Sequence, residues 1–153
     1  EAKSGKPGSG REGMALAQYI AGMGFSNVGL GIDHAMAHTL SAHYDTPHGV
    51  ACAMLLPHAM EFNKPVVAER LAEVATAMGV NTEGMITDEA ADAAIDAVKQ
   101  LSADVEIPAV CEAITEDDLD QIADDALADA CYPGNPREAD HAAVVELFRK
   151  IMK

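Results

Sequence analysis

Four of the six histidines in this 153-residue chain lie between positions 34 and 48. Histidine titrates near neutral pH and is costly to bury without a partner, so this concentration indicates a metal site, a proton relay or a chance feature of one helical face. His34 and His38 are four residues apart, which places them on one face of a helix. His48 follows a turn that contains Pro47 and begins the next helical segment.

Two helices that meet at a corner can bring His34, His38 and His48 together. Converging imidazoles suit a divalent metal such as Fe²⁺ or Zn²⁺. The same three residues can instead form hydrogen bonds with backbone carbonyls, and their spacing alone does not separate the two interpretations. Of the remaining residues, His43 lies roughly opposite on the helical wheel and is expected to be exposed, whereas His58 is either a pocket residue or a core histidine with a satisfied hydrogen bond.

The elements that carry these residues are all expected to be helical. Ala, Met and Leu are abundant, β-branched residues are sparse and no segment alternates with period two, so the sequence predicts an all-α domain without internal repeats. Thr115 and Asp118 predict a capping box at one helix start. Helices are expected over residues 11–25, 27–44, 48–63, 65–80, 87–107, 115–130 and 137–153.

The first ten residues, EAKSGKPGSG, are rich in Gly, Ser, Pro and Lys and are expected to form a flexible linker. Residues 8–13 match G-x-G-x-x-G, the dinucleotide-binding fingerprint. That motif requires a strand leading directly into its glycines, and the preceding residues do not predict one. We therefore assign no cofactor-binding residue.

The composition excludes several classes of protein. The chain has 25 acidic and 10 basic residues, a formal charge of −15, which argues against nucleic-acid binding. No apolar run approaches the roughly 18 to 20 residues that span a bilayer, and no signal-peptide core is present, so we expect a cytoplasmic protein without membrane contact. The three cysteines are Cys52, Cys111 and Cys131, and they form no C-x-x-C pair. Their spacing favours reduced thiols and does not support a thiolate zinc site.

Residues 11–153 resemble the iron-containing (group III) alcohol dehydrogenases, in the branch that includes lactaldehyde reductase (1,2-propanediol oxidoreductase) and 1,3-propanediol dehydrogenase. The stretch GIDHAMAHTLSAHYDTPHG carries the most specific part of the resemblance, and GNPREAD followed by an amphipathic helix matches the closing motif of that branch. The resemblance implies a helical bundle that corresponds to most of the C-terminal metal-binding domain of the dehydroquinate synthase-like fold.

The resemblance also implies roles for individual residues. His34 and His48 match the family's metal ligands, and His38 matches the catalytic residue that relays a proton. Fe²⁺ is the expected ion, Zn²⁺ is the alternative, and NAD(P) carries the hydride in the full-length enzyme. The resemblance implies a small alcohol or diol and the matching aldehyde as substrates. The chemistry agrees with this, since a bound divalent cation lowers the pKa of an alcohol and polarises a carbonyl, and an imidazole can pass the proton to water.

Two parts of the family pattern have no counterpart in these residues: the nucleotide-binding domain and a D-x-x-x-H pair that supplies two further metal ligands. No Asp or His precedes Asp33 in the chain. Asp33 stands where the family usually has Val. It is not expected to replace a missing ligand, because adjacent helical residues such as Asp33 and His34 point about 100° apart. We expect the isolated chain to be inactive and to bind metal weakly. We also expect it to self-associate, as a dimer or domain swap, or to pair with the missing N-terminal half. The alternative is a non-catalytic helical module that binds metal or serves as an oligomerisation fragment.

Overall fold

The computed structural model describes residues 8–153, which form six α-helices and two short 3-10 helices. The α-helices are Ser9–Val28 (α1), Ile32–Tyr44 (α2), His48–Ala77 (α3), Thr87–Asp104 (α4), Leu119–Ala128 (α5) and His141–Ile151 (α6), and the 3-10 helices are Glu116–Asp118 (η1) and Tyr132–Gly134 (η2). No strand occurs in this part of the chain, which confirms the predicted all-α class. None of these helices is both long and apolar enough to cross a membrane.

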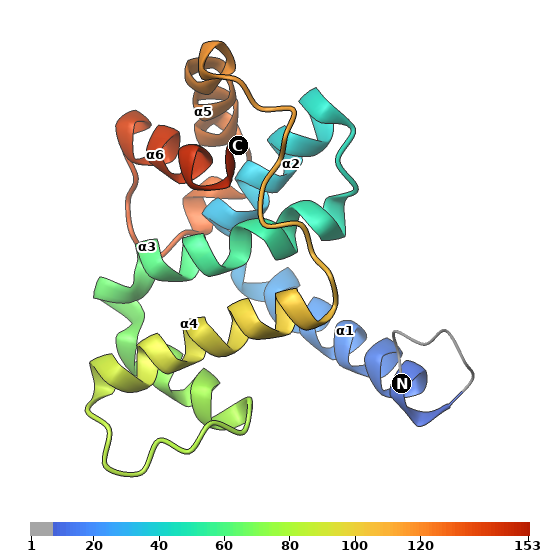
Figure 1. Ribbon diagram of the computed structural model, residues 1–153, viewed down its shortest axis with the longest axis vertical. Helices are drawn as coiled ribbons and strands as arrows, with labels where there is room; N and C mark the ends of the chain where they lie inside the picture. Colours follow the sequence, from blue (N-terminus) through green and yellow to red (C-terminus); the bar gives the residue numbers. More distant parts are fainter. Residues whose placement is uncertain (1–7) are drawn as a thin grey trace.

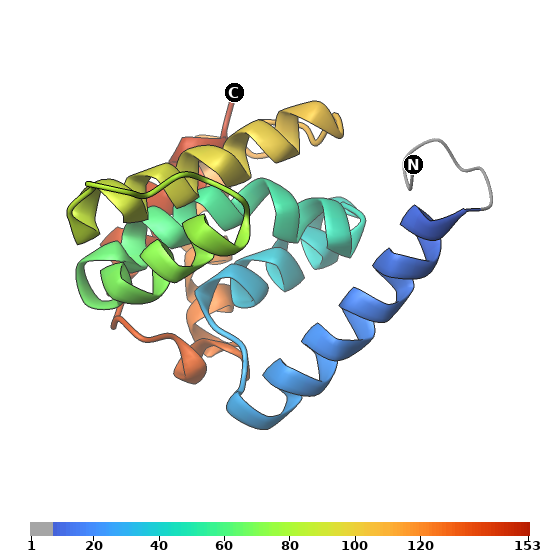
Figure 2. The ribbon, with the colours of Figure 1, turned by 90° about the horizontal axis from the view of Figure 1, so that it is seen from below.

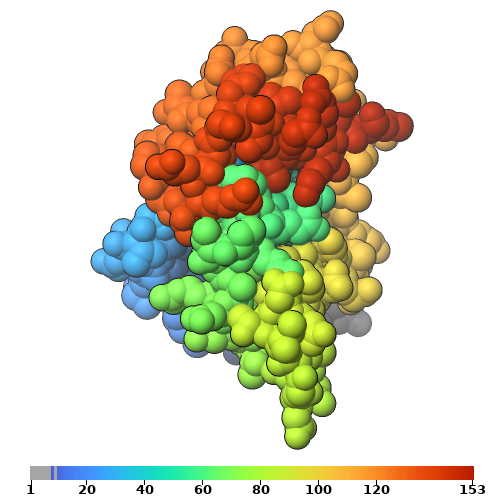
Figure 3. Space-filling model, turned by 90° about the vertical axis from the view of Figure 1, so that its left-hand side faces the viewer, coloured from blue at the N-terminus to red at the C-terminus, as the bar shows by residue number. Residues whose placement is uncertain are grey.

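Helix α3 is the central element of the fold. Helix α4 lies along one side of it, and α2, α5 and α6 pack on the other side (Figure 1). The red C-terminal helix lies directly against green α3 on the face drawn in Figure 3. This arrangement encloses α2, the helix that carries two of the candidate site histidines, between α3 and α5.

Two apolar clusters hold the layers together. The larger one joins α2, the first half of α3, α5 and α6, and its fully buried members include Met36, Leu40, Leu55, Ile122 and Phe148. The smaller one joins the second half of α3 to α4 through Leu71, Ala75, Ala91, Ala94 and Ile95. Apolar side chains that recur every three or four residues produce these faces, so burial of apolar area is the main stabilising term.

The sequence predicted two helices, 48–63 and 65–80, where the structure has the single element α3. This element consists of two helices joined across a kink at Val67, whose φ and ψ of −131° and 18° are not helical, so the predicted division is confirmed and its boundary lies two residues later than predicted. Pro65 explains the kink, because proline lacks the N–H that would bond to the carbonyl four residues earlier and its ring clashes with that carbonyl.

The two predicted N-terminal helices are also divided differently from expectation. Residue 27 does not begin a new helix, since α1 continues to Val28 and α2 starts only at Ile32. Gly29 adopts a φ of +85°, a conformation that favours glycine, and ends α1. The linking segment is held close to η2, where a Cβ on Gly134 would lie 1.9 Å from the carbonyl oxygen of Leu30.

Helix α1 extends away from the other helices (Figure 2). It begins at Ser9, so the last two residues of the predicted linker 1–10 are helical, and positions 1–7 of that linker lie outside the described residues. Several large apolar side chains on α1 are exposed, namely Met14, Leu16, Tyr19, Ile20, Met23, Phe25 and Val28. These side chains are compatible with the predicted self-association or pairing, which stays a prediction.

Two helix starts are set by capping. Thr115 and Asp118 form the predicted capping box, in which the Asp118 carboxylate accepts hydrogen bonds from the backbone N–H and the hydroxyl of Thr115 at 3.0 and 2.8 Å. The last helix begins at His141 instead of the predicted residue 137. Asp140 caps it by accepting a hydrogen bond of 2.8 Å from the backbone N–H three residues later.

Asn135 connects three segments that are distant in the sequence. Its Nδ2 donates to the Asn63 side chain on α3 at 2.9 Å and to the Arg137 carbonyl at 2.6 Å. Its Oδ1 accepts from Asn63 Nδ2 at 3.0 Å and from the backbone N–H of Ile32, the first residue of α2, at 3.3 Å. One amide therefore ties the start of α2 to α3 and to the segment after η2.

We predict that Asn135→Ala lowers the free energy of unfolding by about 2 kcal/mol, because it leaves several half-buried polar groups without partners. Urea unfolding followed by circular dichroism measures this change. The control is Asn81→Ala, which removes only a local bond to the backbone N–H of Glu83 in an exposed turn. Equal losses for the two variants would contradict the role assigned to Asn135.

Glu61 links three helices through ion pairs. Lys99 of α4 and Lys150 of α6 each donate to its carboxylate at 2.7 Å. Burial opposes ionisation of Glu61, but the hydrogen bonds and charges of these two lysines outweigh it and lower the pKa of the carboxyl to about 2. The folded state therefore favours the ionised carboxylate.

Because the folded pKa of Glu61 lies below its ordinary value of 4.5, its stabilising contribution is present above pH 4.5 and is lost as the pH falls towards 2. We predict that Glu61→Gln lowers the free energy of unfolding at pH 7 by about 0.5 to 1 kcal/mol, the range for partly exposed ion pairs. Denaturant unfolding between pH 7 and pH 2.5 should show the two proteins converging at low pH. Glu73→Gln, at an exposed position of α3, serves as the control. A difference in stability between the unmodified chain and Glu61→Gln that persisted undiminished at pH 2.5 would contradict the prediction.

Candidate functional site

The corner between α2 and α3 gathers three histidines. His34 and His38 lie one turn apart on α2, and His48 is the first residue of α3. The ring centroids of His34 and His48 are 5.4 Å apart, those of His38 and His48 are 5.1 Å apart, and those of His34 and His38 are 6.1 Å apart. The structure therefore brings together the three imidazoles that the sequence predicted to converge.

The chain reversal at this corner has a local cause. Asp45 follows α2 in the left-handed conformation with a φ of 52°, and the Ser41 hydroxyl donates to the Thr46 carbonyl at 2.9 Å. Pro47 then precedes the first residue of α3 with a φ of −55°, which its ring imposes. Three residues thus turn the chain and set His48 opposite α2.

The other two histidines of α2 and α3 lie outside this group. His43 is exposed and its Nε2 is 2.7 Å from the Asp125 carboxylate on α5. His58 is half-buried and lines a pocket of about 260 Å³ together with Pro57, Lys99 and others. Its Nδ1 is buried without a hydrogen-bond partner among the described residues, and Glu61 is 3.9 Å away, so it fits the expected pocket residue better than a satisfied core histidine.

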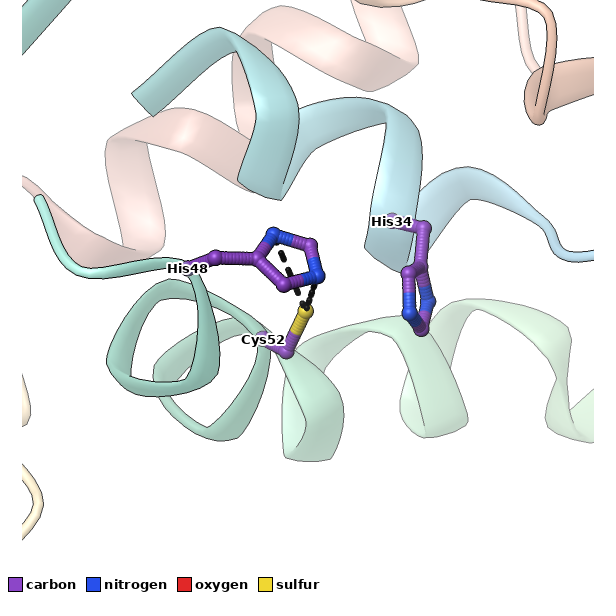
Figure 4. A group of neighbouring side chains, drawn as sticks. All are labelled: His34, His48 and Cys52. Carbon is purple, nitrogen blue, oxygen red and sulfur yellow. Dashed lines mark hydrogen bonds between the residues drawn. The ribbon is translucent and has the colours of Figure 1, made fainter. Parts of the chain in front are cut away.

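Cys52, which was not among the predicted site residues, joins the cluster. It lies one turn after His48 on α3, with its Sγ 3.6 Å from His48 Nε2 (Figure 4). One donor atom from each of His34, His48 and Cys52 lies within 4.8 Å of the other two. The spacing of four residues between His48 and Cys52 was a usable signal, but the cysteines were judged only by the lack of a C-x-x-C pair.

A second group beside His38 was also missed. The Asp129 carboxylate, in the segment after α5, lies 2.9 Å from His38 Nδ1 and accepts a hydrogen bond of 2.7 Å from the backbone N–H of Cys131. Donor atoms of His38, Asp129 and Cys131 also lie within 4.8 Å of one another. Asp129 is 91 positions from His38, so no local pattern in the sequence could reveal this contact.

The surroundings shift the pKa values of this group. Burial, followed by the charges of His48 and His38, lowers the pKa of His34, so its imidazole is neutral at pH 7. Burial and the nearby charge of Asp33 raise the pKa of the Cys52 thiol to about 12. Burial opposes ionisation of Asp129, but hydrogen bonds from Cys131 and His38 outweigh it and lower the pKa of that carboxyl.

Asp33 lies beside the cluster. Its Oδ2 is 3.6 Å from His34 Nδ1, which is too long for a hydrogen bond, and its Oδ1 is buried without a partner among the described residues. Burial raises the pKa of this carboxyl to about 7. A buried carboxyl without a hydrogen-bond partner is stabilised in its ionised form by a bound positive charge, so its place beside His34 favours a cation.

The donor set fits a divalent metal ion. Zinc binds imidazole nitrogen at about 2.0 Å and thiolate sulfur at about 2.3 Å, so donors in one tetrahedral shell are about 3.3 to 3.8 Å apart. The donor atoms of His34, His48 and Cys52 lie within 4.8 Å of one another, so small side-chain rotations that move these atoms by up to about one ångström bring them into that range. The residues thus define a helical module with a cluster of imidazole, thiol and carboxyl groups between two of its helices.

Comparison with known proteins agrees with this description. The model of the C-terminal part of the Fe-containing alcohol dehydrogenase family matches residues 2–152. Lactaldehyde reductase of Escherichia coli (strain K12) is 51% identical over 139 residues, and the match covers 90% of this chain and 36% of that protein. The 1,3-propanediol dehydrogenase of Citrobacter freundii is 44% identical, with coverage of 92% and 37%.

A solved structure shows the same fold. The alcohol dehydrogenase from Oenococcus oeni superposes with a TM-score of 0.82 at 46% sequence identity, over 86% of this chain and 35% of that one. This chain therefore belongs to the iron-containing alcohol dehydrogenase family. It spans about a third of the length of these relatives and corresponds to their C-terminal helical part.

Proposed function

We propose that this chain is the metal-holding helical part of an NAD(P)-linked alcohol dehydrogenase that interconverts small alcohols or diols and aldehydes. The observation that carries the proposal is the convergence of His34, His38 and His48 from two helices. Relatives that are named as lactaldehyde reductase and 1,3-propanediol dehydrogenase support this substrate class.

In this proposal His34 and His48 hold a divalent cation, with Fe²⁺ as the expected ion and Zn²⁺ as the alternative. When bound, the cation lowers the pKa of an alcohol and polarises an aldehyde carbonyl. The lowered pKa of His34 supports its role as a ligand, because a neutral imidazole offers a lone pair at pH 7.

We assign His38 the transfer of the substrate proton. An ionised carboxylate only accepts hydrogen bonds, so Asp129 holds a proton at Nδ1 of His38, and Nε2 is the ring nitrogen that accepts the substrate proton. The anionic Asp129 stabilises the imidazolium that results. The side chain of His38 is 41% exposed, which gives the proton a route to solvent.

The hydride carrier, NAD(P), has no proposed binding residue in this chain. We assign its site, together with the remaining metal ligands, to residues outside the chain, and propose that the chain alone has no dehydrogenase activity. The three free thiols support a cytoplasmic location, where thiols stay reduced.

Metal binding tests the ligand assignment directly. We predict that His34→Ala and His48→Ala each weaken Zn²⁺ binding by roughly tenfold or more, because each removes one imidazole ligand. Competition titration with a chromophoric chelator measures the affinity, and anaerobic Fe²⁺ titration repeats it with the expected ion. His43→Ala is the matched control on α2, and its affinity should equal that of the unmodified chain.

An activity test requires the part of a relative that this chain does not cover. We predict that a fusion of the preceding part of Escherichia coli lactaldehyde reductase to residues 11–153 reduces lactaldehyde with NADH, and that His38→Gln lowers its kcat about 100-fold without changing its metal content. His43→Gln should keep full activity. Loss of metal in the His38 variant, or unchanged turnover, would contradict the proton-transfer role.

The alternative is an assembly module without chemistry. It is favoured by α1, which extends away from the other helices (Figure 2) and carries several exposed apolar side chains. Sedimentation velocity over a range of concentrations separates the two functions when combined with the metal titration. A dimer that takes up no metal would favour the assembly module.

A further inference from the structure

We infer that Cys52 is a third protein ligand of the metal, so that this chain by itself offers an N₂S site made of His34, His48 and Cys52. The inference rests on the proposed binding of a divalent cation by the two histidines. It adds a thiolate to the ligand set, and it identifies which class of metal the isolated chain selects.

The geometry of α3 produces this arrangement. His48 and Cys52 occupy positions four residues apart, so both side chains leave the same face of the helix. The Sγ atom lies 3.6 Å from one ring nitrogen of His48 and 4.0 Å from the other. His34 approaches from α2, and Figure 4 shows its ring to one side of the His48 and Cys52 pair.

The neighbouring donors differ from this set. His38 and Asp129 are already paired at 2.9 Å, and Asp129 also accepts a hydrogen bond from the backbone of Cys131. A metal at that second group would have to replace the pairing that orients His38. An ion bound by His34, His48 and Cys52 replaces only the contact of 3.6 Å between Cys52 Sγ and His48 Nε2.

The charge around the three donors favours a cation. Asp33 contributes a buried carboxyl oxygen without a hydrogen-bond partner in the described part of the chain, and it lies beside His34. A Cys52 thiolate brings one negative charge to this partly buried place, where unbalanced charge is costly, and a divalent cation offsets it.

Coordination exchanges one bond for another without a change of oxidation state. The S–H bond of Cys52 breaks, its proton passes to solvent and an S–metal bond forms. A thiolate is a soft ligand, so the N₂S set selects Zn²⁺ or Co²⁺ over hard cations such as Mg²⁺ and Mn²⁺.

Anaerobic titration of the reduced 153-residue chain with Co²⁺ tests the inference. A thiolate bound to Co²⁺ gives a charge-transfer band in the near ultraviolet, whereas imidazole ligands give only the weaker visible bands. We predict this band in the unmodified chain and in Cys131→Ser, and its loss in Cys52→Ser. Zinc affinity should fall roughly tenfold or more in Cys52→Ser only.

Each outcome decides a separate point. Visible Co²⁺ bands without the thiolate band, abolished by His34→Ala, would overturn the inference and leave the proposed histidine site intact. A thiolate band that disappears in Cys131→Ser and persists in Cys52→Ser would overturn it in favour of the second group. Co²⁺ binding that is absent, or unaffected by His34→Ala and His48→Ala, would overturn the proposed metal site itself. Circular dichroism of each metal-free variant shows that the fold is kept.

Discussion

The reversal of the chain between α2 and α3 is the constraint on which the site depends. Only three residues, 45–47, separate the two helices, so the last turns of α2 and the first turn of α3 must lie close together. Left-handed Asp45 and the fixed φ of Pro47 set the angle of that corner. His48 is then held opposite His34 and His38 by the backbone and does not depend on a flexible loop. A site built on helix positions next to a tight turn is pre-organised before any ligand arrives.

The rest of the fold fixes the positions of α2 and α3 relative to each other. Buried apolar residues of α5 and α6 press α2 against α3 from one side, and the Asn135 amide ties the start of α2 to the middle of α3. The same C-terminal segment that contains Asn135 also delivers Asp129 to His38. One stretch of chain therefore serves both stability and chemistry. Asn135 holds the start of α2 in place, and Asp129, six positions earlier, orients His38.

The sequence predicted the helical class and the gathering of three histidines because both follow from local rules. Period-3.6 apolar patterning identifies helices, and two histidines one turn apart before a proline turn share a face with the residue after it. The contacts with Asp129 and Asn135 were not predictable in this way, since each joins positions about 70 to 100 residues apart. The division of α3 was also predictable from local rules, because proline interrupts the hydrogen bonds of a helix, although the kink falls two residues after Pro65, at Val67. Cys52 was visible at helical spacing from His48, but a motif built from cysteine pairs could not detect a site that mixes one thiol with imidazoles.

The central claim is that the corner between α2 and α3 holds a divalent metal ion. The most direct measurement is a crystal structure of the chain grown with Zn²⁺, with anomalous diffraction recorded on both sides of the zinc absorption edge. The account predicts one strong anomalous peak about 2.0 to 2.3 Å from a ring nitrogen of His34, a ring nitrogen of His48 and the sulfur of Cys52. A peak at His38 and Asp129 instead, or none at the corner while zinc is bound elsewhere on the chain, would contradict it.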